Sequence, residues 1–258
     1  MGNNFVVIPA RGGSKGVLNK NLTPVKGKNL VIRSINHARN LTDEKNIIIS
    51  TDSQKIISEI ANYFGVNNFA LNLNTIEDFG PFKLHYRDHY LSSDKTLITE
   101  VLFSIRNLLI ELGIAPISFC LLQPTSPFRS LEDLRYIKDI ISTNIDTKIS
   151  LVSTCLVGSY HPARMYLRSL NGNLVELEGF SEFRASRRQD LPEVYIRDGG
   201  FYVIGDDLIL NMKQYNKNPI CLIRNYPWTI NIDGENDILI AQGVKNIDIQ
   251  NDPNERLL

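Results

Sequence analysis

A short apolar segment followed at once by a glycine-rich, basic loop constrains the fold of this chain most. Residues 5–8 read Phe-Val-Val-Ile, which is typical of a buried strand because the run is rich in β-branched residues and ends at Pro9. Three glycines follow within five positions, so the backbone can turn tightly and bring its N–H groups close to a ligand. Since α/β folds hold their ligands just after a strand, this position favours a binding loop over a solvated surface turn.

The charges of the loop indicate what it binds. Arg11, Lys15 and Lys20 place three positive charges around it, which suits a polyphosphate. The whole chain is balanced, with 28 Lys and Arg against 28 Asp and Glu, so we expect neither nucleic acid nor a membrane surface as a partner. The spacings of a P-loop and of a dinucleotide-binding loop are both absent. The sequence therefore predicts a local polyphosphate site of another kind.

Strand and helix patterns alternate along much of the chain. Buried-strand runs are predicted at residues 47–49, 117–122, 148–153, 199–204, 219–223 and 228–232. Helical spacing is predicted at residues 29–40, 56–64, 97–112, 131–141 and 235–244, and Asp52 or Ser53 is expected to cap the second of these helices. This rhythm predicts a parallel sheet with helices on its faces.

Two segments interrupt the rhythm. Residues 66–95 show no sustained period and predict a long loop. Its two histidines, His85 and His89, could ligate a metal, but no third ligand is evident and a solvated polar loop is the favoured interpretation. Residues 156–188 contain an Asn-Gly-Asn turn between two short apolar runs, which predicts a hairpin.

Length and cysteine usage bound the class of protein. A chain of 258 residues predicts one large domain or a domain with a small appendage. Cys120, Cys155 and Cys221 are widely spaced within apolar runs and are interpreted as reduced core residues, not as disulfides or zinc ligands. No signal-peptide pattern and no membrane-spanning run is present, so we expect a cytoplasmic protein.

Five motifs, taken together and in order, resemble the acylneuraminate cytidylyltransferase family, which includes the CMP-sialic acid synthetases. One such motif would be weak evidence, but they occur in the family's order across nearly the whole chain. They are residues 8–16 with Lys20-Asn21, then Arg87, Leu91, Asp94 and Thr96, then residues 121–127 with Arg129, then Arg188-Gln189 with residues 191–195 and the strand containing Gly199, and finally Ile232-Asp233.

The resemblance implies a fold and an activity. The fold is α/β, a three-layer α/β/α nucleotide-diphospho-sugar transferase (Rossmann-like) fold with a mostly parallel sheet, in one domain spanning residues 1–258. The activity is transfer of CMP from CTP to a 2-keto-3-deoxy sugar acid, here a sialic-acid-like nonulosonic acid, with release of pyrophosphate and with Mg²⁺ or another divalent cation. Relatives are usually homodimers, and the irregular excursion at about 156–187 is exchanged across the dimer interface.

The resemblance also implies roles for individual residues. The catalytic residues are Arg11, Lys15, Lys20 and Asp233. The nucleotide-binding residues are Ala10, Arg11, Gly12, Gly13, Ser14, Lys15, Asn21, Arg87, Asp94 and Thr96. The sugar-acid-binding residues are Gln123, Thr125, Ser126, Arg164, Arg188, Gln189 and Tyr195, and the metal ligands are Asp233 and Asn231.

Physical chemistry fits these roles. Transfer to a sugar hydroxyl requires neutralisation of the phosphates and the leaving pyrophosphate, which loop N–H groups and cations beside Mg²⁺ can supply. The acceptor carboxylate needs a planar cation, for which Arg188 is the first candidate and Arg164 the second. Alternation on the predicted strand 228–232 places Asn231 on the same side as Asp233. The alternative for Asp233 is that it only caps the following helix.

Two positions depart from the family pattern and leave other functions open. Asn231 stands where many relatives have Asp, and Asp198 stands where relatives usually have Asn. An amide can ligate a metal through oxygen but carries no charge. The nearer alternatives are an octulosonic acid acceptor or another nucleotide. A protein of a different class, which binds the substrates without turnover, is disfavoured because Lys15, Lys20, Gln123, Arg188 and Asp233 are all retained.

Overall fold

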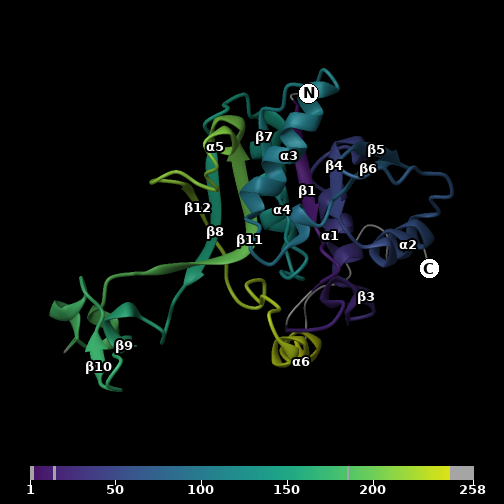
Figure 1. Cartoon of the computed structure of the whole chain (residues 1–258). Coiled ribbons are helices and arrows are strands. Elements are labelled where there is room, and N and C mark those ends of the chain that lie inside the picture. Colours follow the sequence, from purple (N-terminus) through teal and green to yellow (C-terminus); the bar gives the residue numbers. More distant parts are fainter. Residues whose placement is uncertain (1–2, 14–15, 185, 245–258) are drawn as a thin grey trace.

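The computed structural model describes residues 3–13, 16–184 and 186–244, and one eight-stranded sheet forms its centre (Figure 1). The strand order is β12-β8-β11-β7-β1-β4-β6-β5, with β1 parallel to β4 and β7, and with β5 and β11 antiparallel to their neighbours. Their bounds are β1 Asn4–Pro9, β4 Ile47–Thr51, β5 Ile76–Phe79, β6 Phe82–Tyr86, β7 Ser118–Leu121, β8 Ser150–Leu156, β11 Tyr195–Gly205 and β12 Ile220–Ile223. The predicted mostly parallel sheet is confirmed.

Helices cover both faces of this sheet. The first face packs against α1 (Leu30–Arg39), α2 (Gln54–Phe64) and α4 (Leu131–Thr143), and the second packs against α3 (Ile98–Glu111) and α5 (Asp206–Leu210). Side chains of β1 alternate between the two cores, because Val6 and Ile8 join the first while Phe5 and Val7 join the second. A strand buried on both faces reads as a continuous apolar run, and the predicted three-layer arrangement is confirmed.

Short polar side chains fix the helix starts on the first face. Asn29 accepts from the Ile32 N–H at 3.0 Å at the start of α1, next to the small ribbon of β2 (Pro24–Val25) and β3 (Lys28–Asn29). Ser53 accepts from the Ile56 N–H at 3.3 Å and is the cap of α2, one of the two residues predicted for it. The other, Asp52, is therefore free for a different contact.

The prediction of a long solvated loop at 66–95 is wrong. This segment contains the hairpin of β5 and β6, which extends the sheet beyond β4. The two strands are short and carry polar residues on their open side, so no sustained period marks them. His85 is fully buried, with Nδ1 2.9 Å from Ser50 Oγ, and the described residues contain no group of three or more His, Cys, Asp or Glu that could hold a metal.

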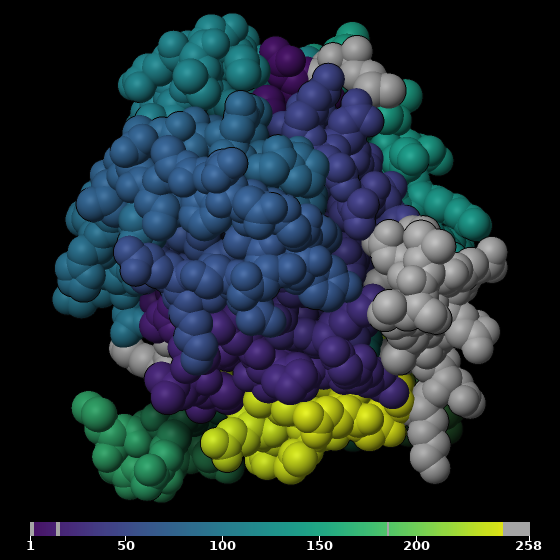
Figure 2. Space-filling model, turned by 90° about the vertical axis from the view of Figure 1, so that its right-hand side faces the viewer, coloured from purple at the N-terminus to yellow at the C-terminus, as the bar shows by residue number. Residues whose placement is uncertain are grey.

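The predicted strand 228–232 is also wrong. The backbone turns there, since the Trp228 N–H donates to Asn225 O at 2.9 Å, and helix α6 (Glu235–Gly243) follows. Ile230 and Ile232 look strand-like in sequence because both enter a small core with Phe128 and Ala241. Figure 2 shows α6 in yellow directly beneath the purple N-terminal segment around β2 and β3.

Residues 157–194, which we call the arm, leave the sheet through the ends of β8 and β11 (Figure 1). The arm carries an antiparallel hairpin of β9 (Tyr166–Arg168) and β10 (Leu174–Glu176), as predicted. The arm has no core of its own, and its apolar side chains are largely exposed. A group of neighbouring exposed apolar side chains is unusual on the surface of a monomer. These side chains are Met165, Tyr166, Leu167, Leu170, Leu174 and Val175.

The structure also bears on the predicted positions of the cysteines and on membrane-spanning helices. Cys120 is buried as predicted, but Cys155 is half-buried and Cys221 is exposed on β12, so the core assignment holds for Cys120 alone. All three are free thiols. Within the described ranges, no helix has both the length and the apolar character needed to cross a membrane.

Candidate active site

A cavity of about 410 Å³ opens where the parallel strands β1 and β7 end. Residues from three separate parts of the chain line it, which is the arrangement expected at the carboxyl edge of an α/β sheet. The lining includes Arg11, Gly16, Lys20, Asn21, Arg87, Asp94, Thr96, Gln123 and Thr125. The structure therefore brings five of the ten residues predicted to bind the nucleotide to one cavity, namely Arg11, Asn21, Arg87, Asp94 and Thr96.

The glycine-rich loop is held at both ends. The Gly12 N–H donates to Asp52 Oδ1 at 2.8 Å, and a Cβ at Gly12 would lie 2.8 Å from the Cβ of Ser53. A Cβ at Gly16 would lie 2.5 Å from the carbonyl oxygen of Asp233, so glycine permits this close approach. The predicted site residues Ser14 and Lys15 lie outside the described residues, and Gly13 meets no neighbour within 4 Å of an added Cβ.

The role of Asp52 was missed because its partner is 40 residues away in sequence. Sequence reasoning considered it only as a helix cap. The sequence around an aspartate at a strand end gives no sign of which distant backbone N–H will donate a hydrogen bond to its carboxylate. Its position at the end of β4, next to the loop after β1, is the signal that strand order would have supplied.

Three cationic groups of the cavity have different partners. Arg11 Nη1 lies 2.7 Å from Asp94 Oδ1, and the Arg11 carbonyl accepts from Asn21 Nδ2 at 2.8 Å. Lys20 Nζ donates to the carbonyl oxygens of Ile232 and Asp233 at 3.0 and 3.2 Å. Thr96 Oγ1 donates to Tyr90 O at 2.5 Å, and Ala10 is buried beneath the loop with its N–H on Ser50 O.

Arg87 is the third cation, and it is 5% exposed. Its Nη1 donates weakly to Leu91 O at 3.4 Å, while Nε and Nη2 have no partner among the described residues. Burial lowers the pKa of Arg87 to about 10, with Asp52 opposing and Arg11 reinforcing this shift, so the group stays charged at neutral pH. A buried guanidinium with unmatched donors favours a ligand that brings acceptors.

Next to the cavity, behind Gln123, several polar atoms converge on Gly199. A Cβ there would lie 3.2 Å from both Gln123 Oε1 and Ser126 Oγ, and 3.8 Å from Asn231 Oδ1. The φ angle of Gly199 is +76°, a conformation that favours glycine. Ser126 Oγ and Asn231 Oδ1 are buried without a hydrogen-bond partner in the described part of the chain. This cluster forms what we call the acceptor side.

Asn231 and Asp233 lie together although no strand joins them. Asn231 Nδ2 donates to Asp233 Oδ2 at 3.4 Å, and the Asp233 carboxylate is 80% exposed and 3.7 Å from Lys20 Nζ. The N–H groups of Asp233 and Gly234 both donate to Asp237 Oδ2, at 2.9 and 2.8 Å. Asp237 thus caps α6, and the alternative that Asp233 only caps this helix is wrong.

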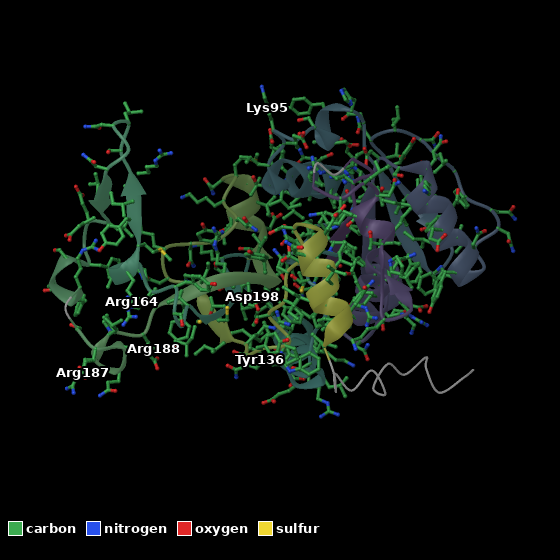
Figure 3. The ribbon with its side chains drawn as sticks, turned by 90° about the horizontal axis from the view of Figure 1, so that it is seen from below. Lys95, Tyr136, Arg164, Arg187, Arg188 and Asp198 are labelled. Atoms are coloured by element: carbon green, nitrogen blue, oxygen red, sulfur yellow. The ribbon has the colours of Figure 1, made fainter. Side chains whose placement is uncertain are left out.

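Four predicted sugar-acid residues are not at this cavity. Figure 3 shows Arg164 and Arg188 on the arm, away from the body that contains Asp198. Gln189 follows Arg188 on the arm, and Tyr195 begins β11 with its hydroxyl donating to Glu193 Oε2 at 2.6 Å. Within one chain the acceptor side therefore comprises Gln123, Thr125 and Ser126 without the arm residues.

Asp198, one of the two departures from the family pattern, is buried and does not line the cavity. Its Oδ2 accepts from Arg224 Nη1 at 2.7 Å, and Arg224 also donates from Nε to Asp133 Oδ2 at 3.0 Å. Sequence reasoning missed Arg224 and Asp133 entirely. Arg129 lies nearby, with Nη1 3.3 Å from Nδ1 of the partly buried His37. Loss of hydration and then Arg129 hold the pKa of His37 well below its usual value.

Comparisons with known proteins match this architecture. The family model described as Cytidylyltransferase matches residues 5–78. The chain is 26% identical to a CMP-N,N'-diacetyllegionaminic acid synthase of Legionella pneumophila, over 89% of this chain and 90% of that protein. It is 28% identical to a pseudaminic acid cytidylyltransferase of Campylobacter jejuni, with 77% of each chain covered.

One solved structure shows the fold. A CMP:2-keto-3-deoxy-manno-octonic acid synthetase in complex with CTP superimposes with a TM-score of 0.57 and 13% identity, covering 93% of this chain and 99% of that one. At this identity the likeness concerns the fold alone. The predicted nucleotide-diphospho-sugar transferase fold is confirmed.

Proposed function

We propose that this chain is a cytidylyltransferase that activates a sialic-acid-like nonulosonic acid by transferring CMP to it from CTP, with release of pyrophosphate. The observation that carries the proposal is the cavity at the ends of β1 and β7. Arg11, Lys20 and the buried Arg87 face it from one side, and Gln123 and Thr125 face it from the other. Relatives named for legionaminic and pseudaminic acids support the acceptor class.

Arg87 is suited to the base or another acceptor-rich part of the nucleotide. Its two unmatched nitrogens lie in a site where a missing hydrogen bond is costly, so a ligand carbonyl oxygen relieves that cost on binding. The glycine-rich loop is suited to the phosphates, because Arg11 and Gly16 of this loop both line the cavity. Arg11 is paired with Asp94 here, and a triphosphate competes for that guanidinium.

The reaction needs neutralisation of charge more than covalent chemistry. A sugar hydroxyl oxygen bonds to the α-phosphorus, the bond from that phosphorus to the oxygen bridging the α- and β-phosphates breaks, and that oxygen leaves with pyrophosphate. The hydroxyl proton passes to solvent. Negative charge then increases on the leaving group. Lys20, held by two backbone carbonyls, presents a fixed cation beside Asp233 for this charge.

A divalent cation fits the exposed carboxylate of Asp233. Asn231 turns its oxygen inward and its amide N–H toward Asp233, so the described residues offer one outward carboxylate here. Such a donor set suits Mg²⁺ that arrives with triphosphate oxygens as further ligands, because Mg²⁺ is commonly held by one or two carboxylates plus substrate phosphates. When bound, the ion neutralises phosphate charge.

We further propose that the arm completes the acceptor side of a second copy in a homodimer. Arg164, Arg188 and Gln189 are displaced from the cavity of their own chain (Figure 3). The exposed apolar side chains of β9 and β10 need a partner surface. Arg188 can then pair with the acceptor carboxylate by two parallel hydrogen bonds.

Pyrophosphate release with a panel of sugar acids, crossed with the four nucleoside triphosphates, tests the proposed function. The expected result is turnover with CTP and a nonulosonic acid. Turnover only with an octulosonic acid, or only with another nucleotide, would reassign the substrate within the same chemistry. Tight CTP binding by calorimetry without turnover for any pair would instead identify a binding protein.

A further inference from the structure

Beneath the acceptor side lies a buried cluster of four charged side chains. Arg224 has no exposed side-chain surface and contacts Asp133 and Asp198 as described above. Arg129 lies beside it, and both guanidinium groups stack over the ring of Phe201, at 5.3 and 5.4 Å from its centroid. Two guanidinium groups and two carboxylates balance one another, so the cluster is neutral as a whole.

The other N–H groups of the two arginines bind the backbone of segments that carry site residues. Arg224 Nη2 donates to the carbonyl oxygens of Phe128 and Trp228, both at 2.7 Å. Arg129 donates to the carbonyl oxygens of Gln123 (3.0 Å), Ser126 (2.8 Å) and Gly200 (3.0 Å). The cluster thus holds the loop 123–128, the turn before Asn231 and strand β11 together.

Asp198 fixes the backbone at the convergence point of the acceptor side. Its Oδ1 accepts from Ser153 Oγ at 2.5 Å and from the Gly200 N–H at 3.0 Å. A Cβ at Gly200 would lie 1.8 Å from Arg224 Nη1, so glycine is required for the guanidinium to fit. Gly199, which lies between Asp198 and Gly200, is the residue around which Gln123 and Ser126 converge.

The segment that carries Asn231 is held at both ends. Arg224 binds the carbonyl of Trp228, and the Ile232 N–H donates to Thr125 O at 2.7 Å. We propose, on the basis of the function proposed above, that Arg224 and Asp198 are positioning residues for the acceptor. They set the loop 123–128 against Asn231 without touching the substrates.

This role explains why Asp198 departs from the family pattern. A neutral amide at this position would leave the cluster with an uncompensated buried positive charge. Burial and then Arg224 already lower the pKa of Arg129 to about 9, and Asp198 acts against this shift. The carboxylate therefore compensates the buried positive charge of the cluster, and charged guanidinium groups hold the loop carbonyls most strongly.

The test compares two Asp→Asn substitutions of matched shape. Asp198→Asn removes the charge from the cluster. Asp206→Asn removes it from a second partly buried pair, in which Arg106 Nε and Nη2 lie 2.8 and 3.1 Å from the carboxylate oxygens of Asp206. That pair joins α3 to α5 at the opposite end of β7 from the cavity, and it serves as the control.

We expect Asp198→Asn to lower kcat/KM for the sugar acid by roughly 10- to 100-fold, because small displacements of a positioned group are costly in rate. The Kd for CTP, measured by calorimetry, should stay within about twofold of its value in the unchanged chain. Arg11, Lys20 and Arg87, which we call the nucleotide side, lie on other elements. Asp206→Asn should lower Tm without changing kcat/KM below the transition. Arg224→Lys should not restore positioning, since an ammonium cannot contact the four acceptors at once.

Three results would overturn the proposal. The first is an unchanged kcat/KM for the sugar acid in Asp198→Asn. The second is a lower Tm in both Asp198→Asn and Asp206→Asn with no loss of rate in either. The third is an equal loss of affinity for CTP and for the sugar acid in Asp198→Asn. Absence of turnover by the unchanged chain with every sugar acid would instead contradict the proposed function. The two failures are therefore distinguishable.

Discussion

The nucleotide side of the cavity is built from strand ends of one sheet, whereas the acceptor side divides between that sheet and the arm. Arg11, Lys20 and Arg87 reach the cavity within one chain. Arg164 and Arg188 do not, because the arm carries them away from the body (Figure 3). The residues proposed to bind the nucleotide are therefore together in one chain, whereas the cation proposed to bind the acceptor carboxylate is not at the cavity of its own chain.

The halves also differ in how their backbone is held. In the described part of the glycine-rich loop, the Gly12 N–H is held by a single hydrogen bond to Asp52. The sheet part of the acceptor side rests on the buried cluster around Arg224. The comparison teaches that the body fixes Gln123, Ser126 and Asn231 through buried contacts, whereas Arg164 and Arg188, which we propose to bind the acceptor carboxylate, lie on a segment without a core.

The largest effect should come from Asp233, which lies between the halves. Asp233→Asn should lower turnover by about 100-fold or more, because it removes the carboxylate predicted to act with the phosphates and Mg²⁺. Steady-state pyrophosphate release measures this. Asp237→Asn is the matched control, since that residue caps α6 and should cost about 1 kcal/mol of stability with turnover retained.

A result in which Asp233→Asn lowers only Tm, while Asp237→Asn lowers only turnover, would reverse the two assignments. Tightened metal binding in Asn231→Asp, measured by Mn²⁺ titration without nucleotide, would show that position 231 can present a carboxylate outward. That outcome would sharpen the account of why Asn231 turns inward here.

Arg188 separates the halves next. Arg188→Ala should lower kcat/KM for the sugar acid by roughly 10- to 150-fold, the usual loss for a charge-assisted pair, with the Kd for CTP unchanged. Arg187→Ala is the control. Arg187 is next to Arg188 in the chain, but it is exposed and pairs with Asp190 at 3.0 Å. A loss confined to CTP affinity would place Arg188 on the nucleotide side and break the comparison.

Substitution of Arg87 should affect CTP binding and not the sugar acid, and the loss should be smaller than that for Arg188. Arg87→Met should weaken CTP binding by roughly 10-fold through loss of donors to the nucleotide, with the KM for the sugar acid unchanged. It should also raise Tm or leave it unchanged, because the two unmatched nitrogens of a buried cation are removed. Lower stability together with unchanged CTP affinity would assign Arg87 to the fold.

The smallest effect is a pH dependence of stability on the nucleotide side. Burial and then Arg87 lower the pKa of His85 to about 3, so the folded state holds the ring neutral. Stability from this group is complete above its unfolded pKa and falls as pH decreases from about 6.5 toward 3, reaching a loss of about 2 kcal/mol at pH 5. Urea unfolding at pH 7 and 5 should show a smaller acid loss in His85→Gln than in the unchanged chain, and an equal loss would reject the assignment.

Much of the fold was predictable because the central strands are buried on both faces. Residues such as Val6 and Ile48 lie in apolar runs that leave little doubt about a sheet with two helical layers. The edge hairpin of β5 and β6 was not predictable, since Asp78 and Lys83 face solvent and interrupt the pattern. The turn at 228–232 imitated a strand because Ile230 and Ile232 both pack inward.

The candidate site was predictable only where its residues are close in sequence. The loop after β1 and the segment from Gln123 to Ser126 are local motifs. Asp133, Asp198 and Arg224 are far apart along the chain, and each could equally stand on a solvated surface. Only the fold shows that Arg224, a residue without any motif, binds them both.

Subunit mixing tests the central comparison most directly. Asp233→Asn disables the body part of a site, and Arg188→Ala disables the arm part. If the arm serves the partner's cavity, each mixed dimer has one site in which both parts are intact. Random re-association of the two inactive variants should then restore roughly one quarter of the normal rate of pyrophosphate release. No recovery on mixing, with mixed dimers verified by mass spectrometry, would contradict the account, because it would mean that each arm acts within its own chain.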